Sequence, residues 1–288
     1  MIRILCMFMM LLLLCAGQAS AGLFDSIQKG IDMISTTSDA TQKAAREISD
    51  EEEYYLGRAV AARILQTYPL MKEGKLTEYV NTIGSVLALH SEKPYTYGGY
   101  HFAILDSDEM NAFACPGGTI LITRGMLMST ATEDEIAAIL AHEIAHINHR
   151  DGIASIKKSR WTEATVIIGS KAARNYGPQE LSQLTGIFEG SVDDIVKTLL
   201  VRGYGKSQEY DADKAALTCL SGSGYNPEAL KDVLGRMVSS GKGSEGGIMK
   251  THPGTTDRID HIRTSLPAEP ADPVPLGKRT GRFTALLR

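Results

Sequence analysis

Residues 132–149, with the sequence TEDEIAAILAHEIAHINH, form the stretch that decides the fold. Thr132 is a favourable helix N-cap, and Glu135 three residues later completes a capping box. Apolar residues then recur every three or four positions, which predicts an amphipathic helix. Asp151 and Gly152 form a stop signal, so we expect this helix to end near His149.

Two histidines, His142 and His146, lie four residues apart on this helix. Side chains at this spacing lie on the same helix face, so both imidazoles can bind one metal ion. Glu143 flanks that face and can act as a general base on a water at the metal. The His-Glu-x-x-His spacing is typical of zinc metalloproteases, where zinc lowers the pKa of its bound water to about 7. A surface helix with two incidental histidines is the alternative.

Catalytic zinc has three protein ligands and an open position, and Glu209 is the best candidate for the third ligand. It lies on a helix predicted at 207–220, with Asp213 one turn later on the same face. We expect Glu209 to bind zinc and Asp213 to accept the free N–H of a zinc-bound histidine. A solvated acidic face is the alternative interpretation of this run.

The remaining patterns predict an α+β fold that is mostly helical, with a small mixed sheet packed against the zinc helix. Further helices are expected at 51–68, 76–89 and 227–238, and strands at 100–105, 111–115 and 119–123. Pro116-Gly117-Gly118 between the last two strands is turn chemistry and predicts a hairpin. Residues 153–203 are weakly helical in pattern.

Four motifs in this order resemble a family of zinc endopeptidases, the gluzincins that include the CaaX prenyl protease and the bacterial heat-shock membrane protease. The motifs are Asn111-Ala112-Phe113-Ala114 with Pro116-Gly117-Gly118, His142 to His146 with Arg150, Glu209 to Asp213, and Thr251-His252-Pro253 with Arg258-Ile259. The resemblance covers roughly residues 50–265 and implies a zincin-like metalloprotease fold with endopeptidase activity.

The resemblance also implies roles for residues outside the zinc helix. An edge strand formed by Asn111, Ala112, Phe113 and Ala114 would bind substrate by adding its extended backbone to the sheet. His252 would lie near the zinc, where it either stabilises the oxyanion or occupies the open position. Arg258 would support the wall of the active site or pair with Asp257 or Asp260.

Two residues depart from the family pattern. Asp151 stands where many relatives have histidine, and Cys115 replaces a more usual apolar residue beside the substrate strand. We expect neither to touch the proposed ligands. The transmembrane helices of some members and the helical repeats of others have no counterpart in the sequence, so we expect a soluble, minimal form.

The N-terminus resembles a secretory signal peptide over residues 1–21. A single basic residue precedes an apolar run that ends at Cys15, and Ala19-Ser20-Ala21 follows as a cleavage site. A buried N-terminal helix and lipidation at Cys15 are the alternatives. A polar leader is expected at 22–50, the protease domain at 51–266, and a loosely packed, Pro-rich basic tail at 267–288. Export would allow Cys115 and Cys219 to pair, although two free buried thiols fit equally well.

The composition favours no nucleic-acid partner, because the 30 lysines and arginines are outnumbered by 34 acidic residues and leave no large positive charge. The basic run at 157–161 could touch an anionic membrane surface, although such a run is more often a solvated helix end. The leading hypothesis is an exported, periplasmic endopeptidase with one zinc ion that cleaves unfolded or misassembled envelope proteins. A latent, client-binding module with His252 on the metal, or a structural metal site, is the alternative. The sequence does not determine the oligomeric state.

Overall fold

A computed structural model describes residues 48–156, 189–240, 247–266 and 276–287, all within one compact unit that begins at Ile48. The predicted signal peptide, Cys15, most of the leader and the basic run at 157–161 lie outside the described residues.

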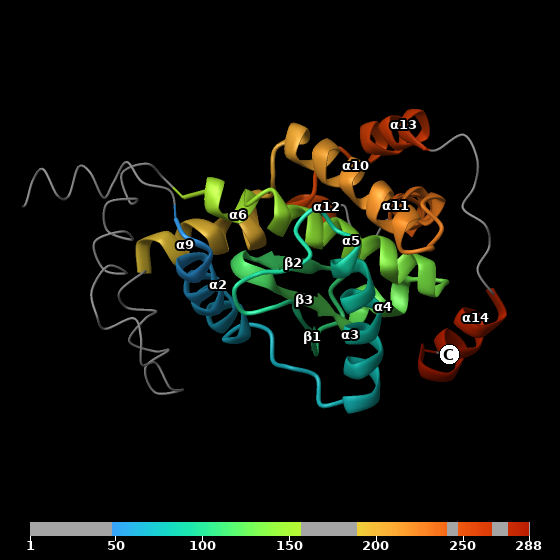
Figure 1. The fold of residues 1–288 in the computed structure, drawn as a ribbon, viewed down its shortest axis with the longest axis horizontal. Coiled ribbons are helices and arrows are strands. Elements are labelled where there is room, and N and C mark those ends of the chain that lie inside the picture. The colour runs from blue at the N-terminus through green and yellow to red at the C-terminus, as the bar shows by residue number, and fades with distance from the viewer. Residues whose placement is uncertain (1–47, 157–188, 241–246, 267–275, 288) are drawn as a thin grey trace, which may run out of the picture. The chain divides into compact units, whose positions relative to one another are not determined.

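The sheet has three strands in the order β1-β3-β2. Strand β1 (His101–Leu105) runs parallel to β3 (Thr119–Thr123), whereas β2 (Ala112–Cys115) runs antiparallel to β3. The predicted small mixed sheet is therefore confirmed, and β2 lies at its edge. The sheet lies at the centre of the fold, with helices packed around it (Figure 1).

The turn between β2 and β3 is a single 3-10 turn, η1 (Pro116–Gly118). Gly117 has a φ of 76°, and a Cβ there would lie 2.5 Å from the Cα of Tyr54. Tyr54 belongs to helix α2 (Asp50–Leu65). Glycine is required at this position because it permits both the left-handed backbone and the direct contact of α2 with the hairpin.

Helix α5 (Glu133–Asn148) is central, and every residue from Glu133 to Ile147 is buried. Its polar face is therefore turned to the protein interior and not to solvent, unlike that of a surface amphipathic helix. The Thr132 hydroxyl accepts a hydrogen bond from the Glu135 N–H, as predicted. The Glu135 carboxylate accepts from the Ala131 N–H instead of the Thr132 N–H, so only half of the expected capping box forms.

The other helices pack around α5 and the sheet, and α3, α10 and α11 contact α5 directly. Their bounds are α3 (Gly74–Leu89), α4 (Arg124–Ser129), α6 (Asp151–Ala154), α9 (Glu189–Lys197), the π-helix η4 (Thr198–Arg202), α10 (Lys206–Gly222), α11 (Glu228–Ser240), α12 (Ile248–Thr251) and α13 (Thr255–Ser265). The predicted, mostly helical α+β fold is confirmed. None of the helices in the described ranges combines the length and apolar character needed to cross a bilayer.

The C-terminal region differs from the loose packing expected for the tail. Residues Leu276–Leu287 form helix α14, whose Phe283 and Leu287 are buried. Arg279 pairs with Asp134 at 2.9 Å, and Arg282 pairs with Glu133 at 2.6 Å. Both carboxylates lie in the first turn of α5, so the basic residues that suggested a solvated tail hold α14 against the central helix.

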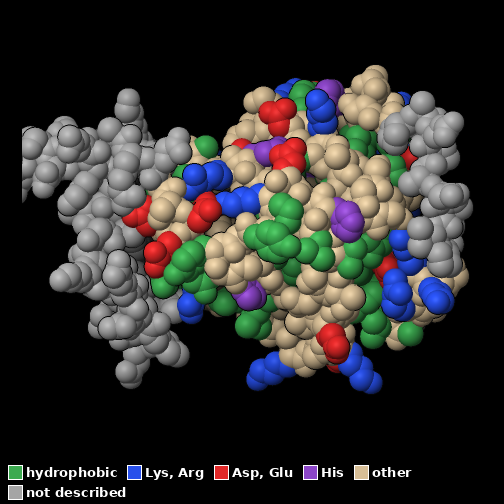
Figure 2. Space-filling model, in the orientation of Figure 1, with side chains coloured by type: hydrophobic (Ala, Val, Ile, Leu, Met, Phe, Trp, Pro, Cys, Tyr) green, Lys and Arg blue, Asp and Glu red, His purple; other side chains and the backbone are tan. Residues whose placement is uncertain are grey.

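The two cysteines of the described unit, Cys115 and Cys219, are free and buried. Of the two alternatives, free thiols are therefore what the structure contains. On the face shown in Figure 2, basic and acidic side chains are interspersed over the described part of the surface. This distribution agrees with the nearly balanced charge of the sequence.

Candidate metal centre

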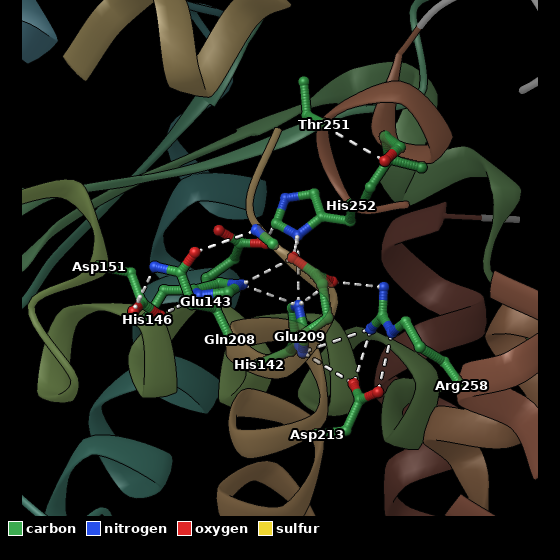
Figure 3. Close-up of polar contacts among 12 residues, drawn as sticks. His142, Glu143, His146, Asp151, Gln208, Glu209, Asp213, Thr251, His252 and Arg258 are labelled. Carbon is green, nitrogen blue, oxygen red and sulfur yellow. Dashed lines mark hydrogen bonds and ion pairs between the residues drawn. The ribbon is translucent and has the colours of Figure 1, made fainter. Parts of the chain in front are cut away.

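The predicted ligands come together between α5 and α10. His142 and His146 project from α5, Glu209 from the first turn of α10, and His252 follows the end of α12 (Figure 3). One ligand atom from each of the four lies within 4.8 Å of the others, and all four residues are buried. The Nε2 atoms of His142 and His146 are 3.1 Å apart, and each is 3.5 Å from a Glu209 oxygen.

The chemistry of this cluster fits a divalent cation. Two imidazoles and a carboxylate form a ligand set of catalytic zinc sites. Glu143, beside them, is fully buried, and neither of its carboxylate oxygens has a hydrogen-bond partner. A buried carboxylate without a partner is costly, and a neighbouring cation offsets that cost.

Asp213 lies directly behind His142, in a position from which it can orient the imidazole. The Asp213 Oδ1 atom lies 3.0 Å from the His142 Nδ1 atom. Arg258 binds Asp213 through two hydrogen bonds of 2.6 and 2.8 Å and contacts Glu209 at 2.7 Å. Arg258 pairs with these two carboxylates and lies in the wall beside His142. Of the two expectations, support of the active-site wall therefore fits the structure, and an ion pair with Asp257 or Asp260 does not.

The electrostatics of this side follow from these contacts. Burial and Arg258 lower the pKa of His142, whereas Asp213 and Glu209 raise it. The raising effects are larger, and the net pKa is about 9. Burial raises the pKa of Glu209, whereas His252, His142 and Arg258 lower it, and the net pKa is well below its usual value. Glu209 is therefore an anion at neutral pH, as a metal ligand must be.

His146 is held by Asp151, and here the expectation that Asp151 does not touch the ligands is wrong. The Asp151 Oδ2 atom lies 2.7 Å from the His146 Nδ1 atom. The cause is the chain reversal after α5, where Arg150 adopts a left-handed backbone with a φ of 59°. Asp151 then opens α6 next to the helix it has just left. The position of Asp151, just after the C-terminus of the metal-binding helix, is the sequence signal that could have revealed this contact.

Comparison with known proteins agrees with this geometry. Residues 74–266, about two thirds of the chain, match Peptidase family M48. The chain belongs to peptidase family M48. This confirms the family resemblance predicted from the four motifs.

Individual relatives of this M48 chain are more distant. It is 25% identical over 241 residues to the Beta-barrel assembly-enhancing protease of Escherichia coli strain K12, which covers 81% of the chain and 47% of that protein. It is 23% identical over 195 residues to Metalloprotease LoiP of the same strain, covering 68% of the chain and 71% of that protein. The chain thus spans about half the length of the first curated relatives it matches.

Tyr204 is a residue of the M48 site that sequence reasoning missed. Its ring stacks on His146, with centroids 4.2 Å apart, and its backbone N–H donates to the carbonyl of Thr251. The hydroxyl is buried and has no hydrogen-bond partner. Burial and the Glu143 carboxylate raise the pKa of Tyr204 well above its usual value, so the hydroxyl stays protonated and remains a donor. No metal-ligand spacing in the sequence indicates this residue.

The predicted substrate strand borders the same centre. Ala112, Phe113 and Ala114 lie in β2 and are at most 3% exposed, and Asn111 immediately precedes it. The Asn111 side-chain oxygen lies 3.4 Å from the Thr251 hydroxyl. This contact connects the strand to the segment that carries His252.

A small cavity of about 20 Å³, roughly the space of one water molecule, adjoins the metal centre of the M48 domain. His142, Glu143 and His252 lie on its wall. The rest of the lining is mainly apolar and includes Ile139, Leu230, Val233, Leu234, Met237 and Ile248. The polar centre is therefore bordered on this side by an apolar wall.

Proposed function

We propose that this chain is a zinc-dependent endopeptidase that hydrolyses peptide bonds in unfolded or misassembled proteins of the cell envelope. The observation that carries the proposal is the buried convergence of His142, His146 and Glu209 next to the carboxylate of Glu143, which has no hydrogen-bond partner. Membership of a peptidase family supports the same reaction.

His142, His146 and Glu209 would hold the zinc ion. Bound zinc supplies a Lewis acid that polarises the substrate carbonyl and lowers the pKa of water. The carboxylate of Glu143 accepts a proton from the attacking water and then donates it to the departing amine nitrogen. Because Glu143 accepts no hydrogen bond from the protein, both of its oxygens are available for this transfer.

The substrate is proposed to be an extended polypeptide. Its backbone would pair with β2, from Ala112 to Ala114, and one apolar side chain would pack against the apolar wall beside Glu143. Such a site contacts the backbone and apolar side chains of the substrate, which unfolded chains expose. The name of the Escherichia coli relative, Beta-barrel assembly-enhancing protease, supports a substrate in the envelope, and the sequence of residues 1–21 supports export to the periplasm.

A latent form of the same site is the second candidate, because His252 lies among the ligands. Its Nδ1 atom is 3.1 Å from Glu209 and 3.3 Å from the His142 Nε2 atom, and its Nε2 atom is 3.6 Å from Glu143. Every residue of the centre is buried. An imidazole in this position would compete with substrate, so the chain would hold clients and cleave few of them.

The test is degradation of casein by the purified chain, with Glu143→Gln as the matched variant and zinc content measured for both. Zinc in both proteins, with cleavage only by the unmodified chain, is the expected result. Zinc in both without cleavage would favour the latent form, and His252→Ala should then release activity. Cleavage by Glu143→Gln at the unmodified rate would exclude Glu143 as the base.

A further inference from the structure

His146 is held by a carboxylate that lies outside the four family motifs. Asp151 is only 6% exposed, and its Oδ2 atom is 2.7 Å from the His146 Nδ1 atom. Ionised carboxylates accept hydrogen bonds but cannot donate them, so the His146 Nδ1–H must be the donor. The Nε2 lone pair of His146 then faces His142 and Glu209.

The second oxygen of Asp151 connects this contact to α10. The Gln208 side chain donates from Nε2 to the Asp151 Oδ1 atom at 2.8 Å. Its own oxygen accepts from the Gly205 N–H at 3.0 Å, at the start of α10. Gln208 immediately precedes Glu209, so the chain of hydrogen bonds runs from His146 to the turn that carries Glu209.

The backbone around Asp151 is constrained to make this contact. Arg150 is the one described residue other than glycine with a positive φ, a conformation that costs roughly 1–2 kcal/mol. Arg150 forms an ion pair with Glu53 of α2 at 2.8 Å. On the other side of Asp151, a Cβ on Gly152 would lie 3.1 Å from the Pro116 ring. The turn is thus fixed by α2 and by η1 on either side of Asp151.

We propose that Asp151 and Gln208 are positioning residues of the metal centre, which fix the tautomer of His146 and couple its orientation to that of Glu209. The inference rests on the proposed zinc site and extends it to two residues that no family motif includes. Partners of this kind behind a metal-bound histidine typically change metal affinity by about 10- to 100-fold when they are removed.

The experiment measures zinc affinity of the full chain by competition with a chromophoric chelator, together with the visible spectrum of the Co²⁺-substituted protein. The variants are Asp151→Ala, the isosteric Asp151→Asn, and Gln208→Ala. Asp211→Ala is the matched control, because Asp211 is an exposed aspartate of α10 that lines the same surface cavity as Asp151.

We expect Asp151→Ala to weaken zinc binding by about 10- to 100-fold and to change the Co²⁺ spectrum, whereas Asp211→Ala changes neither. Asp151→Asn keeps an oxygen acceptor, so its zinc affinity should lie between those of Asp151→Ala and Asp211→Ala. Gln208→Ala should weaken binding in the unmodified background and have no further effect in Asp151→Ala, since the two residues act through one hydrogen bond.

Two outcomes separate this inference from the proposed function. If Asp151→Ala and Asp151→Asn both match the Asp211→Ala control in affinity and spectrum, the positioning role is overturned while the protease proposal stands. If the unmodified chain binds zinc with the expected variant pattern but cleaves no casein, the positioning role is supported and the protease proposal fails.

Discussion

The two histidines of the metal centre are held by carboxylates in contrasting surroundings. Behind His142, Asp213 is fully buried and its charge is offset by two hydrogen bonds from Arg258. Behind His146, Asp151 borders an open polar cavity of about 470 Å³ and accepts a hydrogen bond from the neutral amide of Gln208. A carboxylate far from water needs a cation to offset its desolvation, whereas one beside water needs only an amide.

The largest effect should come from removing the cation on the His142 side. Arg258→Met leaves the carboxylates of Asp213 and Glu209 buried without their guanidinium partner, and we expect a loss of about 3–5 kcal/mol in the free energy of unfolding. Urea unfolding of the metal-free chain measures it. A loss below about 1 kcal/mol would mean that Arg258 is not the partner on which these charges depend.

Zinc binding, which involves both His142 and His146, should stabilise the folded state. At a free zinc concentration about 100 times its Kd, the folded state gains about 2.7 kcal/mol, so the thermal midpoint should rise on zinc addition and fall with a chelator. Glu143→Gln should keep this response, because Glu143 is not among the four side chains that converge on the site. An absent response in Glu143→Gln alone would place Glu143 among the ligands.

A substitution behind His146 should change the free energy of unfolding far less. Gln208→Leu removes the neutral donor to Asp151 and the acceptor of the Gly205 N–H, so we expect a loss of about 1–2 kcal/mol in the free energy of unfolding. The ratio of the Arg258 and Gln208 effects, measured in the same urea experiment, tests the contrast between the two sides. Equal losses would show that water in the cavity does not screen Asp151.

The smallest change in stability is expected at Tyr204, which stacks on His146 and not on His142. Tyr204→Phe keeps the stacked ring and removes a buried hydroxyl without a partner, so the free energy of unfolding should stay constant or rise by about 1 kcal/mol. Casein cleavage is measured on the same preparation, with Tyr225→Phe as a control whose hydroxyl is bonded to Glu133. Lower cleavage at unchanged stability would assign the Tyr204 hydroxyl to the substrate.

Local patterns predicted most of the fold correctly. Helix α5, the hairpin and the helix that carries Glu209 follow from caps, glycine turns and apolar periodicity, all of which act within a few residues. The sequence predicts a loose tail, because its proline and basic residues give no local reason to pack. Helix α14 is held by Glu133 and Asp134, which lie about half a chain away in sequence.

The sequence by itself determined the family of this protein, and it predicted that His142 and His146 share a helix face and that Asp213 lies beside a histidine. These depend on the fixed 3.6-residue repeat of a helix, which brings side chains four apart to one face. Only the tertiary structure decided that Arg258 binds two site carboxylates, that Asp151 turns back onto His146 and that Tyr204 covers it. Those contacts depend on how separate elements pack and on one left-handed residue, Arg150, and no short-range pattern specifies either.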